Sequence, residues 1–217
     1  MATEGSWPSI QARGLLSTSS LLDVYGVDSP TRARILGAHR PQSVTIKAEG
    51  LPPATIRDQK PMSDGALQKC LDDGLSPREW YEILNSKAFF WLSRARLNRL
   101  LGARAYRKSP QVVLTLDTAS IVASHEKMIS LSPINSGATI FNAQPRGLAT
   151  FKPIAKYPFD DWKAKRGVRD AVVELVVEGG VPDITKHVLA VHEVYEQKSR
   201  RLWKAERADE TEGPYDM

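Results

Sequence analysis

The stretch that most constrains the fold is RDAVVELVVEGGVPDI, Arg169–Ile184, because its valine-rich run Ala171–Val177 is typical of a buried β-strand. Side chains alternate along a strand, so Glu174 shares a face with Val172 and Val176. A carboxylate on such a strand faces water on a one-sided sheet, pairs with an arginine inside the protein, or lines a cleft where its charge is used. The pattern leaves all three open. The candidate arginine partners are Arg57, Arg166 and Arg169.

Other strand-like runs precede and follow this one. They lie at Ser43–Glu49, Lys87–Leu92, Gln111–Asp117, Met128–Ser132 and Val188–Tyr195. Helix signals dominate the first half of the chain, and strand signals dominate the second, without strict alternation of the two. We therefore predict an α+β fold with a mostly antiparallel or mixed β-sheet core and helices in the N-terminal half.

The helix starts carry capping residues. Ser29-Pro30 offers a capping hydroxyl and a proline at the first helical position. Ser76-Pro77 with Glu79 three residues later predicts a capping box. Ser63 and Ser93 are expected to be further N-caps.

With 217 residues the chain is long enough for one large core, and we expect a single domain over residues 1–205. The stretch that follows Tyr195, EQKSRRLWKAERADETEGPYDM, is expected to begin as a charged helix. Residues 206–217 are acidic and contain Gly and Pro, which predicts a frayed tail.

Several classes of protein are disfavoured. No window approaches the roughly 18 apolar residues of a membrane span, and the N-terminus lacks the order of a signal peptide, so we expect a cytoplasmic protein without a membrane partner. The single Cys70 excludes an internal disulfide and a cysteine cluster, and it is expected to fill core space. GxxxxGK[ST], GxGxxG and GxSxG motifs are absent from the sequence.

The four histidines also argue against a metal site. His187 and His192 are five residues apart in a probable strand, and an odd separation places them on opposite faces. His39 and His125 are scattered elsewhere in the chain. We therefore expect no bound metal.

Positive charge is concentrated in one region. The formal net charge is +5, and no acidic residue occurs between Glu82 and Asp117. Such a surface suits a polyanion such as nucleic acid, although a solvated helix face would have the same pattern. The cations in this gap are Lys87, Arg94, Arg96, Arg99, Arg104, Arg107 and Lys108.

Four segments, in order, resemble the DarT-like ADP-ribosyltransferase toxins, through a related bacterial family. SWPSIQARGLLS, Ser6–Ser17, is similar to the PSI and GLL pattern that follows their NAD-binding strand, and KAFFWLSRARL, Lys87–Leu97, to their aromatic strand. SPINSGATIF, Ser132–Phe141, looks like their small-residue loop. Arg169–Ile184 resembles the strand that carries their catalytic glutamate. Together these matches span most of the chain from Ser6 to about Val194.

The resemblance implies a split ADP-ribosyltransferase-like sheet, NAD as co-substrate and no metal. It makes Glu174 the catalytic glutamate and Arg57 the catalytic arginine. Ser9, Phe90 and Trp91 would border the NAD. The residues expected to bind the acceptor are Asn135, Ser136, Arg166, Arg94 and Arg96, and the element Tyr157–Asp170 would present it.

One position departs from the family. An NAD-contacting histidine stands shortly before the PSI segment in those enzymes, and here that position falls ahead of Met1, where the chain offers Ala2-Thr3-Glu4. Either the true start lies upstream, which we favour, or this copy binds NAD poorly or not at all.

Three functions follow. The resemblance predicts an ADP-ribosyltransferase that modifies a DNA base, with single-stranded DNA favoured, as a toxin or phage-defence effector countered by an antitoxin or an ADP-ribosyl hydrolase. The alternatives are a nucleic-acid-binding protein that keeps the fold without activity, and a transferase that modifies a protein side chain.

Overall fold

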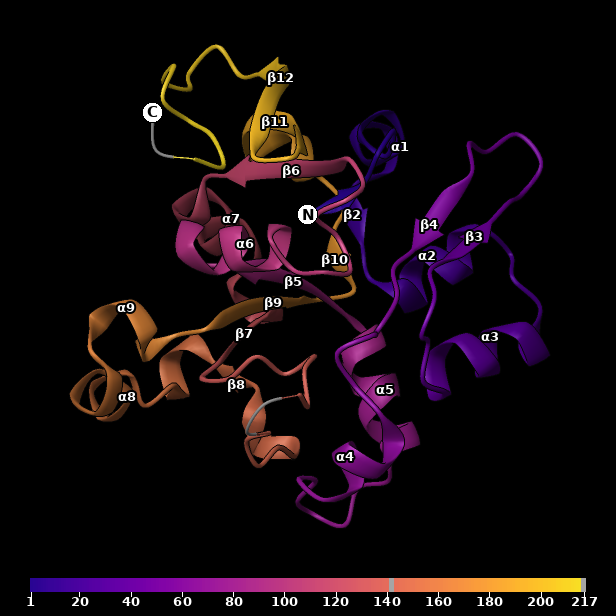
Figure 1. The fold of residues 1–217 in the computed structure, drawn as a ribbon, viewed down its shortest axis with the longest axis vertical. Helices are drawn as coiled ribbons and strands as arrows, with labels where there is room; N and C mark the ends of the chain where they lie inside the picture. The colour runs from indigo at the N-terminus through magenta and orange to yellow at the C-terminus, as the bar shows by residue number, and fades with distance from the viewer. Residues whose placement is uncertain (141–142, 216–217) are drawn as a thin grey trace. The chain divides into compact units, whose positions relative to one another are not determined.

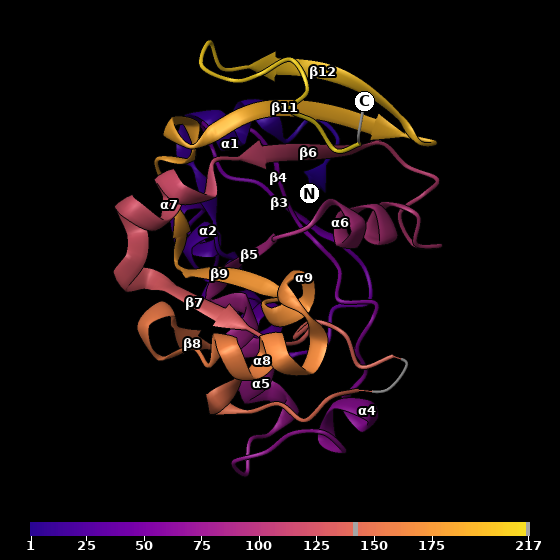
Figure 2. The same cartoon turned by 90° about the vertical axis from the view of Figure 1, so that its left-hand side faces the viewer.

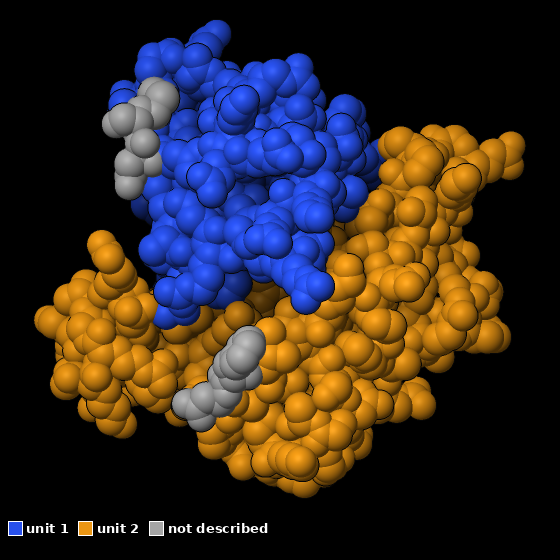
Figure 3. Space-filling view, in the orientation of Figure 1, with its two compact units in different colours: residues 1–15, 91–126, 181–217 blue, residues 16–90, 127–180 orange. Residues whose placement is uncertain are grey.

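The computed structural model describes residues 1–140 and 143–215, so Phe141 and the last two residues of the expected tail lie outside the described residues. The chain divides into two compact units, each assembled from separate stretches (Figure 3). Unit 1 comprises Met1–Leu15, Trp91–Glu126 and Val181–Met217, and unit 2 comprises Leu16–Phe90 and Lys127–Gly180. The single domain predicted for residues 1–205 stays a prediction.

Unit 1 is built on a four-stranded sheet with the order β1-β6-β11-β12. Every neighbouring pair is antiparallel, and Figure 2 shows β6, β11 and β12 side by side. The strands are β1 (Ala2–Thr3), β6 (Gln111–Leu116), β11 (Val188–Tyr195) and β12 (Lys198–Lys204). The helices are α1 (Trp7–Arg13), α6 (Arg94–Leu101), α7 (Thr118–His125) and the 3₁₀ turn η4 (Ile184–Lys186).

Strand β12 shows that the prediction of a charged helix after Tyr195 is wrong. Glu196 and Gln197 both have positive φ, 48° and 64°, and form a two-residue hairpin turn of the kind whose twist matches paired strands. The chain then returns along β11, where Arg200 Nη2 lies 2.9 Å from Glu193 Oε1 across the pair. Cross-strand pairing therefore overrides the helix propensity of this charged segment.

The described part of the predicted tail contacts the rest of unit 1. Lys204 Nζ donates to the carbonyl of Ala208, whose side chain is buried. Arg201 and Lys204 both lie 2.7 Å from Glu210, and Arg94 Nε donates to the carbonyl of Gly213. Glu210 thus pairs with two cations of β12.

Unit 2 contains a four-stranded sheet with the order β5-β9-β7-β8 and a separate antiparallel hairpin, β3-β4 (Figure 1). Its strands are β3 (Val44–Ile46), β4 (Ala54–Ile56), β5 (Lys87–Trp91), β7 (Ile129–Ser132), β8 (Lys152–Pro153) and β9 (Glu174–Glu178). Its helices are α2 (Thr18–Val24), α3 (Ser29–Gly37), α4 (Asp64–Gln68), α5 (Pro77–Asn85), α8 (Phe159–Arg166) and α9 (Val168–Ala171). Short elements complete the chain: η1 (Glu126–Met128), η2 (Leu148–Thr150), η3 (Ile154–Lys156), and the paired strands β2 (Leu15–Leu16) and β10 (Gly180–Val181).

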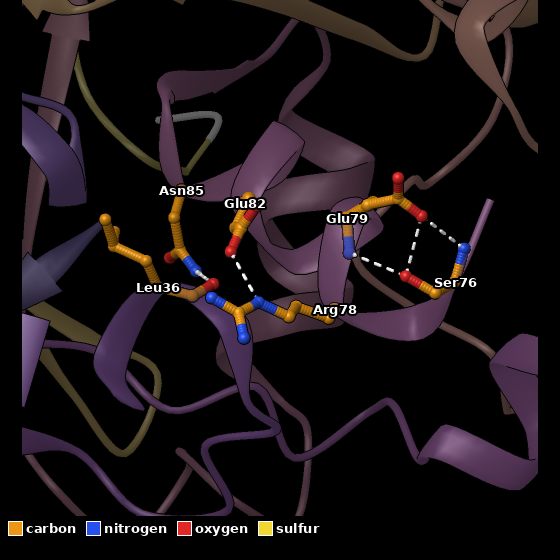
Figure 4. Close-up of polar contacts among 6 residues, drawn as sticks. All are labelled: Leu36, Ser76, Arg78, Glu79, Glu82 and Asn85. Atoms are coloured by element: carbon orange, nitrogen blue, oxygen red, sulfur yellow. Dashed lines mark hydrogen bonds and ion pairs between the residues drawn. The ribbon is translucent and has the colours of Figure 1, made fainter. Parts of the chain in front are cut away.

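Helix α5 anchors unit 2 through both its start and its buried face. Ser76 and Glu79 form the predicted capping box, with Ser76 N donating to Glu79 Oε2 at 2.8 Å and Glu79 N donating to Ser76 Oγ at 3.3 Å (Figure 4). At the other end Asn85 Nδ2 donates to the carbonyl of Leu36, which ties α5 to α3. The buried face packs into a cluster of Met62, Leu67, Cys70, Trp80, Tyr81 and Leu84.

The predicted α+β class is confirmed, since helices and antiparallel sheets are both present in the described residues. Cys70 lies in the core, and Ser63 and Ser93 are N-caps, as predicted. The cap of α3, however, is Asp28, whose carboxylate accepts from Thr31 N, and Ser29 is the first helical residue. Helices are also less confined to the first half than predicted, because α7, α8 and α9 lie in the second. Among the helices of the described chain, none has the length and apolar character needed to span a membrane.

Candidate active site

Glu174 is the first residue of β9, where the strand enters the sheet of unit 2. Glu174 is 4% exposed, and it pairs with Ser132 on the neighbouring strand β7. The sequence predicts a strand from Ala171, but Ala171 is the last residue of α9. The chain is already hydrogen-bonded to β7 at Val173, whose backbone N donates to the carbonyl of Ser132 at 2.9 Å. The carboxylate therefore projects from the end of a strand that neighbours fix on both sides.

The loop after β7 folds back onto this carboxylate. Ser132 Oγ donates to the carbonyl of Ile134 at 3.0 Å, which tightens the first turn of the loop. Ser136, fully buried, then donates twice to Glu174 Oε2, from its backbone N at 3.2 Å and from its hydroxyl at 2.7 Å. These two bonds replace hydration that the buried carboxylate would otherwise lose.

A buried arginine lies behind the same loop. Arg146 is 2% exposed, and its Nη1 donates to the carbonyl of Ser136 at 2.9 Å while its Nε donates to the carbonyl of Gln144 at 3.0 Å. Its own backbone is held by hydrogen bonds with Cys70 and Asp72. Ser136 thus lies between a buried anion and a buried cation. Its backbone N and hydroxyl donate to the Glu174 carboxylate, and its carbonyl accepts from the Arg146 guanidinium.

Burial lowers the pKa of Arg146, and the nearby carboxylate of Glu174 acts in the opposite direction. Even with a lowered pKa a guanidinium remains charged at neutral pH. The site therefore holds opposite charges in an environment where their interaction is stronger than in water. Sequence reasoning missed Arg146, because AQPRGL carries no periodic or motif signal.

Of two more predicted residues, Asn135 lies on this loop and Arg166 contacts it from α8. Arg166, at the end of α8, donates from Nη1 to the carbonyl of Pro133, and its guanidinium lies 4.3 Å from the ring centroid of Trp162. Asn135 is exposed next to Ser136. The structure thus brings Glu174, Asn135, Ser136 and Arg166 to one loop. Of these, Arg166 and Asn135 face solvent, where an acceptor could reach them.

The other predicted residues of the NAD site lie on separate elements. Arg57 follows β4 and is half-buried, with its carbonyl accepting a 2.8 Å hydrogen bond from Arg40 Nε. Phe90 and Trp91 end β5 and are both half-buried. Ser9, in α1 of unit 1, is half-buried as well. Their roles toward NAD stay predictions.

The cationic region is carried mainly by unit 1. Arg94, Arg96 and Arg99 lie on α6, and the remaining three cations of that unit follow in the turn before β6. A groove of about 670 Å³ lies beside them and is lined by residues that include Tyr106, Arg107, Lys108, Tyr195 and Tyr215. Lys87 is separate, because it lies on β5 of unit 2 and forms a 2.6 Å ion pair with Glu178.

Comparison with known proteins gives a family. The model of DUF7002, described as a family of unknown function, matches residues 1–188, so the chain belongs to that family. Searches of curated proteins and of solved structures found no match.

Proposed function

We propose that the protein is an NAD-dependent mono-ADP-ribosyltransferase that modifies a nucleobase, with Glu174 as its catalytic carboxylate. The observation that carries this proposal is the placement of Glu174: it is 4% exposed, at the start of a central strand, and fixed by two hydrogen bonds from Ser136. A solvent-facing carboxylate on the outside of a sheet would not support it.

The proposed reaction requires a fixed negative charge beside the ribose. Breaking the bond between nicotinamide and ribose builds positive charge on the ribose, as in glycoside hydrolysis. A preorganised anion lowers the barrier because it stabilises the charge as the charge develops and needs no reorganisation at that moment. The dry surroundings of Glu174 would strengthen this interaction.

Access to the carboxylate requires movement. A group that is 4% exposed cannot contact a ribose unless a neighbouring segment shifts. The loop that carries Ser136 is the segment bound directly to it, so substrate entry would exchange the Ser136 hydrogen bonds for bonds to a ribose hydroxyl. Arg146 would keep the base of the loop in place through the carbonyl of Ser136.

The nucleic-acid part of the proposal is supported by unit 1. Cationic groups neutralise phosphates, and aromatic rings stack on unpaired bases, so a groove that combines them suits a single strand. Arg107 and Lys108 are exposed at a groove that is also lined by Tyr195, an exposed aromatic residue. We place this activity in the cytoplasm, in a toxin or phage-defence effector held in check by an antitoxin or an ADP-ribosyl hydrolase.

The experiment is incubation of the purified protein with NAD labelled in its adenine, in separate samples of single-stranded DNA, RNA and cell protein. We expect label on single-stranded DNA. Label on protein alone would move the activity to a protein acceptor. If no sample is labelled while DNA binds in a salt-sensitive manner, the proposed enzyme is excluded in favour of a nucleic-acid-binding protein.

A further inference from the structure

Three side chains that are distant in the sequence converge in unit 1. His125 Nε2 lies 2.7 Å from Asp183 Oδ1, and His187 Nε2 lies 3.6 Å from the same oxygen. One potential ligand atom from each residue falls within 4.8 Å of the other two. The expectation that the histidines share no site compared His187 with His192, but in the structure the neighbour of His187 is His125.

The backbone positions these residues firmly. His125 is the last residue of α7, and Asp183 and His187 flank the short turn η4. The start of α7 is tied to the same turn, because Asp117 N donates to the carbonyl of His187 at 2.8 Å. The two imidazole rings lie 5.5 Å apart at 76°, so each presents a different edge to the carboxylate.

An ion pair explains the contact between His125 and Asp183, but it does not explain the position of His187. Asp183 Oδ1 is the partner of His125 Nε2, and Lys186 Nζ lies 3.3 Å from the other oxygen, Asp183 Oδ2. His187, however, is 1% exposed, and its Nε2 has no hydrogen-bond partner among the described residues. At 3.6 Å the carboxylate oxygen is too far away to be that partner.

The other nitrogen of His187 is occupied. Its Nδ1 lies 2.8 Å from Ser120 Oγ, on the first half of α7. When Nδ1 donates its proton to that hydroxyl, Nε2 carries a lone pair aimed at Asp183 and His125. This arrangement is the one that histidine ligands of metals adopt, with the second nitrogen held by an outer partner.

We propose that His125 Nε2, Asp183 Oδ1 and His187 Nε2 bind a divalent transition metal, with zinc as the best fit. Ligand atoms in a tetrahedral zinc site with bonds of about 2.0 Å lie about 3.3 Å apart. The present separations from Asp183 Oδ1, 2.7 and 3.6 Å, lie on either side of that value. Small movements of the side chains would therefore complete three legs of a tetrahedron.

The fourth position would face solvent. The side chains of His125 and Asp183 are 16% and 30% exposed, whereas that of His187 is 1% exposed. A water molecule or one further group can reach the metal from that side. Because the ligands come from α7 and from both sides of η4, the metal would cross-link two segments of unit 1 that are 58 residues apart at His125 and Asp183.

The test uses the full chain, freed of metal with a chelator and titrated with Zn²⁺ in competition with a chromophoric indicator. The variants are His125→Gln and Asp183→Asn, both on the solvent side of the cluster, with His39→Gln of unit 2 as the matched control. We expect one zinc per chain for the wild type and the control, and at least a tenfold loss of affinity in each cluster variant.

Two further measurements make the result decisive. Circular dichroism shows that each variant is folded before it is titrated, and Co²⁺ in place of Zn²⁺ reports the coordination through its visible absorption. We expect the absorption of a four- or five-coordinate cobalt in the wild type and its loss in both cluster variants. The proposal is overturned if the wild type binds no zinc, or if both cluster variants bind zinc as tightly as the control.

Discussion

The hydroxyl of Ser136 donates a 2.7 Å hydrogen bond to the carboxylate of Glu174, a residue 38 positions further along the chain. This bond joins the loop after β7 to the start of β9, and both residues are buried. It satisfies an anion that burial would otherwise make costly. The behaviour of that pair underlies the first two predictions.

Replacement of Ser136 by Ala is expected to lower the free energy of unfolding by about 1.5–3 kcal/mol, because a hydrogen bond to a charged, buried acceptor is lost. Urea denaturation measures this change. Asn135→Ala is the control: Asn135 is exposed in the same loop, and its replacement should change the free energy by less than about 0.5 kcal/mol. Equal effects of the two variants would contradict the role given to Ser136.

Replacement of Arg146 by Met is expected to be more damaging, at about 3–5 kcal/mol, because it removes a cation near Glu174 and takes the donor away from the buried carbonyl of Ser136 and the half-buried carbonyl of Gln144. Arg99→Met, at an exposed position on α6, serves as the control. A loss below about 1 kcal/mol for the Arg146 variant would show that its guanidinium does not support the loop.

The capping box of α5 should make stability depend on pH. Hydrogen bonds from the backbone and hydroxyl of Ser76 lower the pKa of Glu79 below its ordinary value of 4.5. A carboxylate with a lowered folded pKa stabilises the protein above its unfolded pKa, and that stabilisation is lost as the pH falls through the folded pKa.

Thermal unfolding of Glu79→Gln and wild type should therefore differ at pH 7, and the difference should shrink as the pH falls below about 4.5. Glu82→Gln, on the same helix, is the comparison, because Glu82 makes an exposed ion pair with Arg78. A difference between Glu79→Gln and wild type that stays constant from pH 7 to pH 3 would contradict the assignment.

If the groove of unit 1 contacts phosphates, the double variant Arg107→Ala and Lys108→Ala should weaken binding of single-stranded DNA and reduce its salt dependence. The slope of log affinity against log salt should fall by about 1.4, since each phosphate contact on a single strand contributes about 0.7. Fluorescence anisotropy at several salt concentrations measures the slope.

Lys47→Ala with Lys60→Ala is the matched control, because it removes the same charge from exposed positions in unit 2. Its slope should equal that of the wild type. If both double variants change the slope equally, DNA binding responds to net charge alone and the groove has no special part in it.

Much of the fold follows from local signals in the sequence. Ser76 with Glu79 predicts a capping box because both partners are close in the chain, and the strand at Val188–Tyr195 agrees with the structure at both ends. Local signals do not predict a segment whose structure depends on contacts with residues distant in the sequence. The segment after Tyr195 pairs with β11 instead of forming a helix, because its partner strand is supplied by the fold.

The candidate site likewise contains residues that the sequence reveals and residues that only the folded chain brings together. Glu174 is visible as a charge in an apolar strand, and Ser136 belongs to a recognisable small-residue loop. Arg146 has no such signal, since only the folded chain brings it to the carbonyl of Ser136. The cluster of His125, Asp183 and His187 was likewise missed, because two of its members are 58 residues apart.

The most direct test of the central claim is transfer of ADP-ribose from labelled NAD by wild type, Glu174→Gln and Glu178→Gln under identical conditions. Glu178 ends the same strand but is exposed and paired with Lys87, so its variant should retain the wild-type rate. We predict that Glu174→Gln remains folded and transfers no measurable label. Transfer by Glu174→Gln at the wild-type rate would show that this carboxylate is not catalytic.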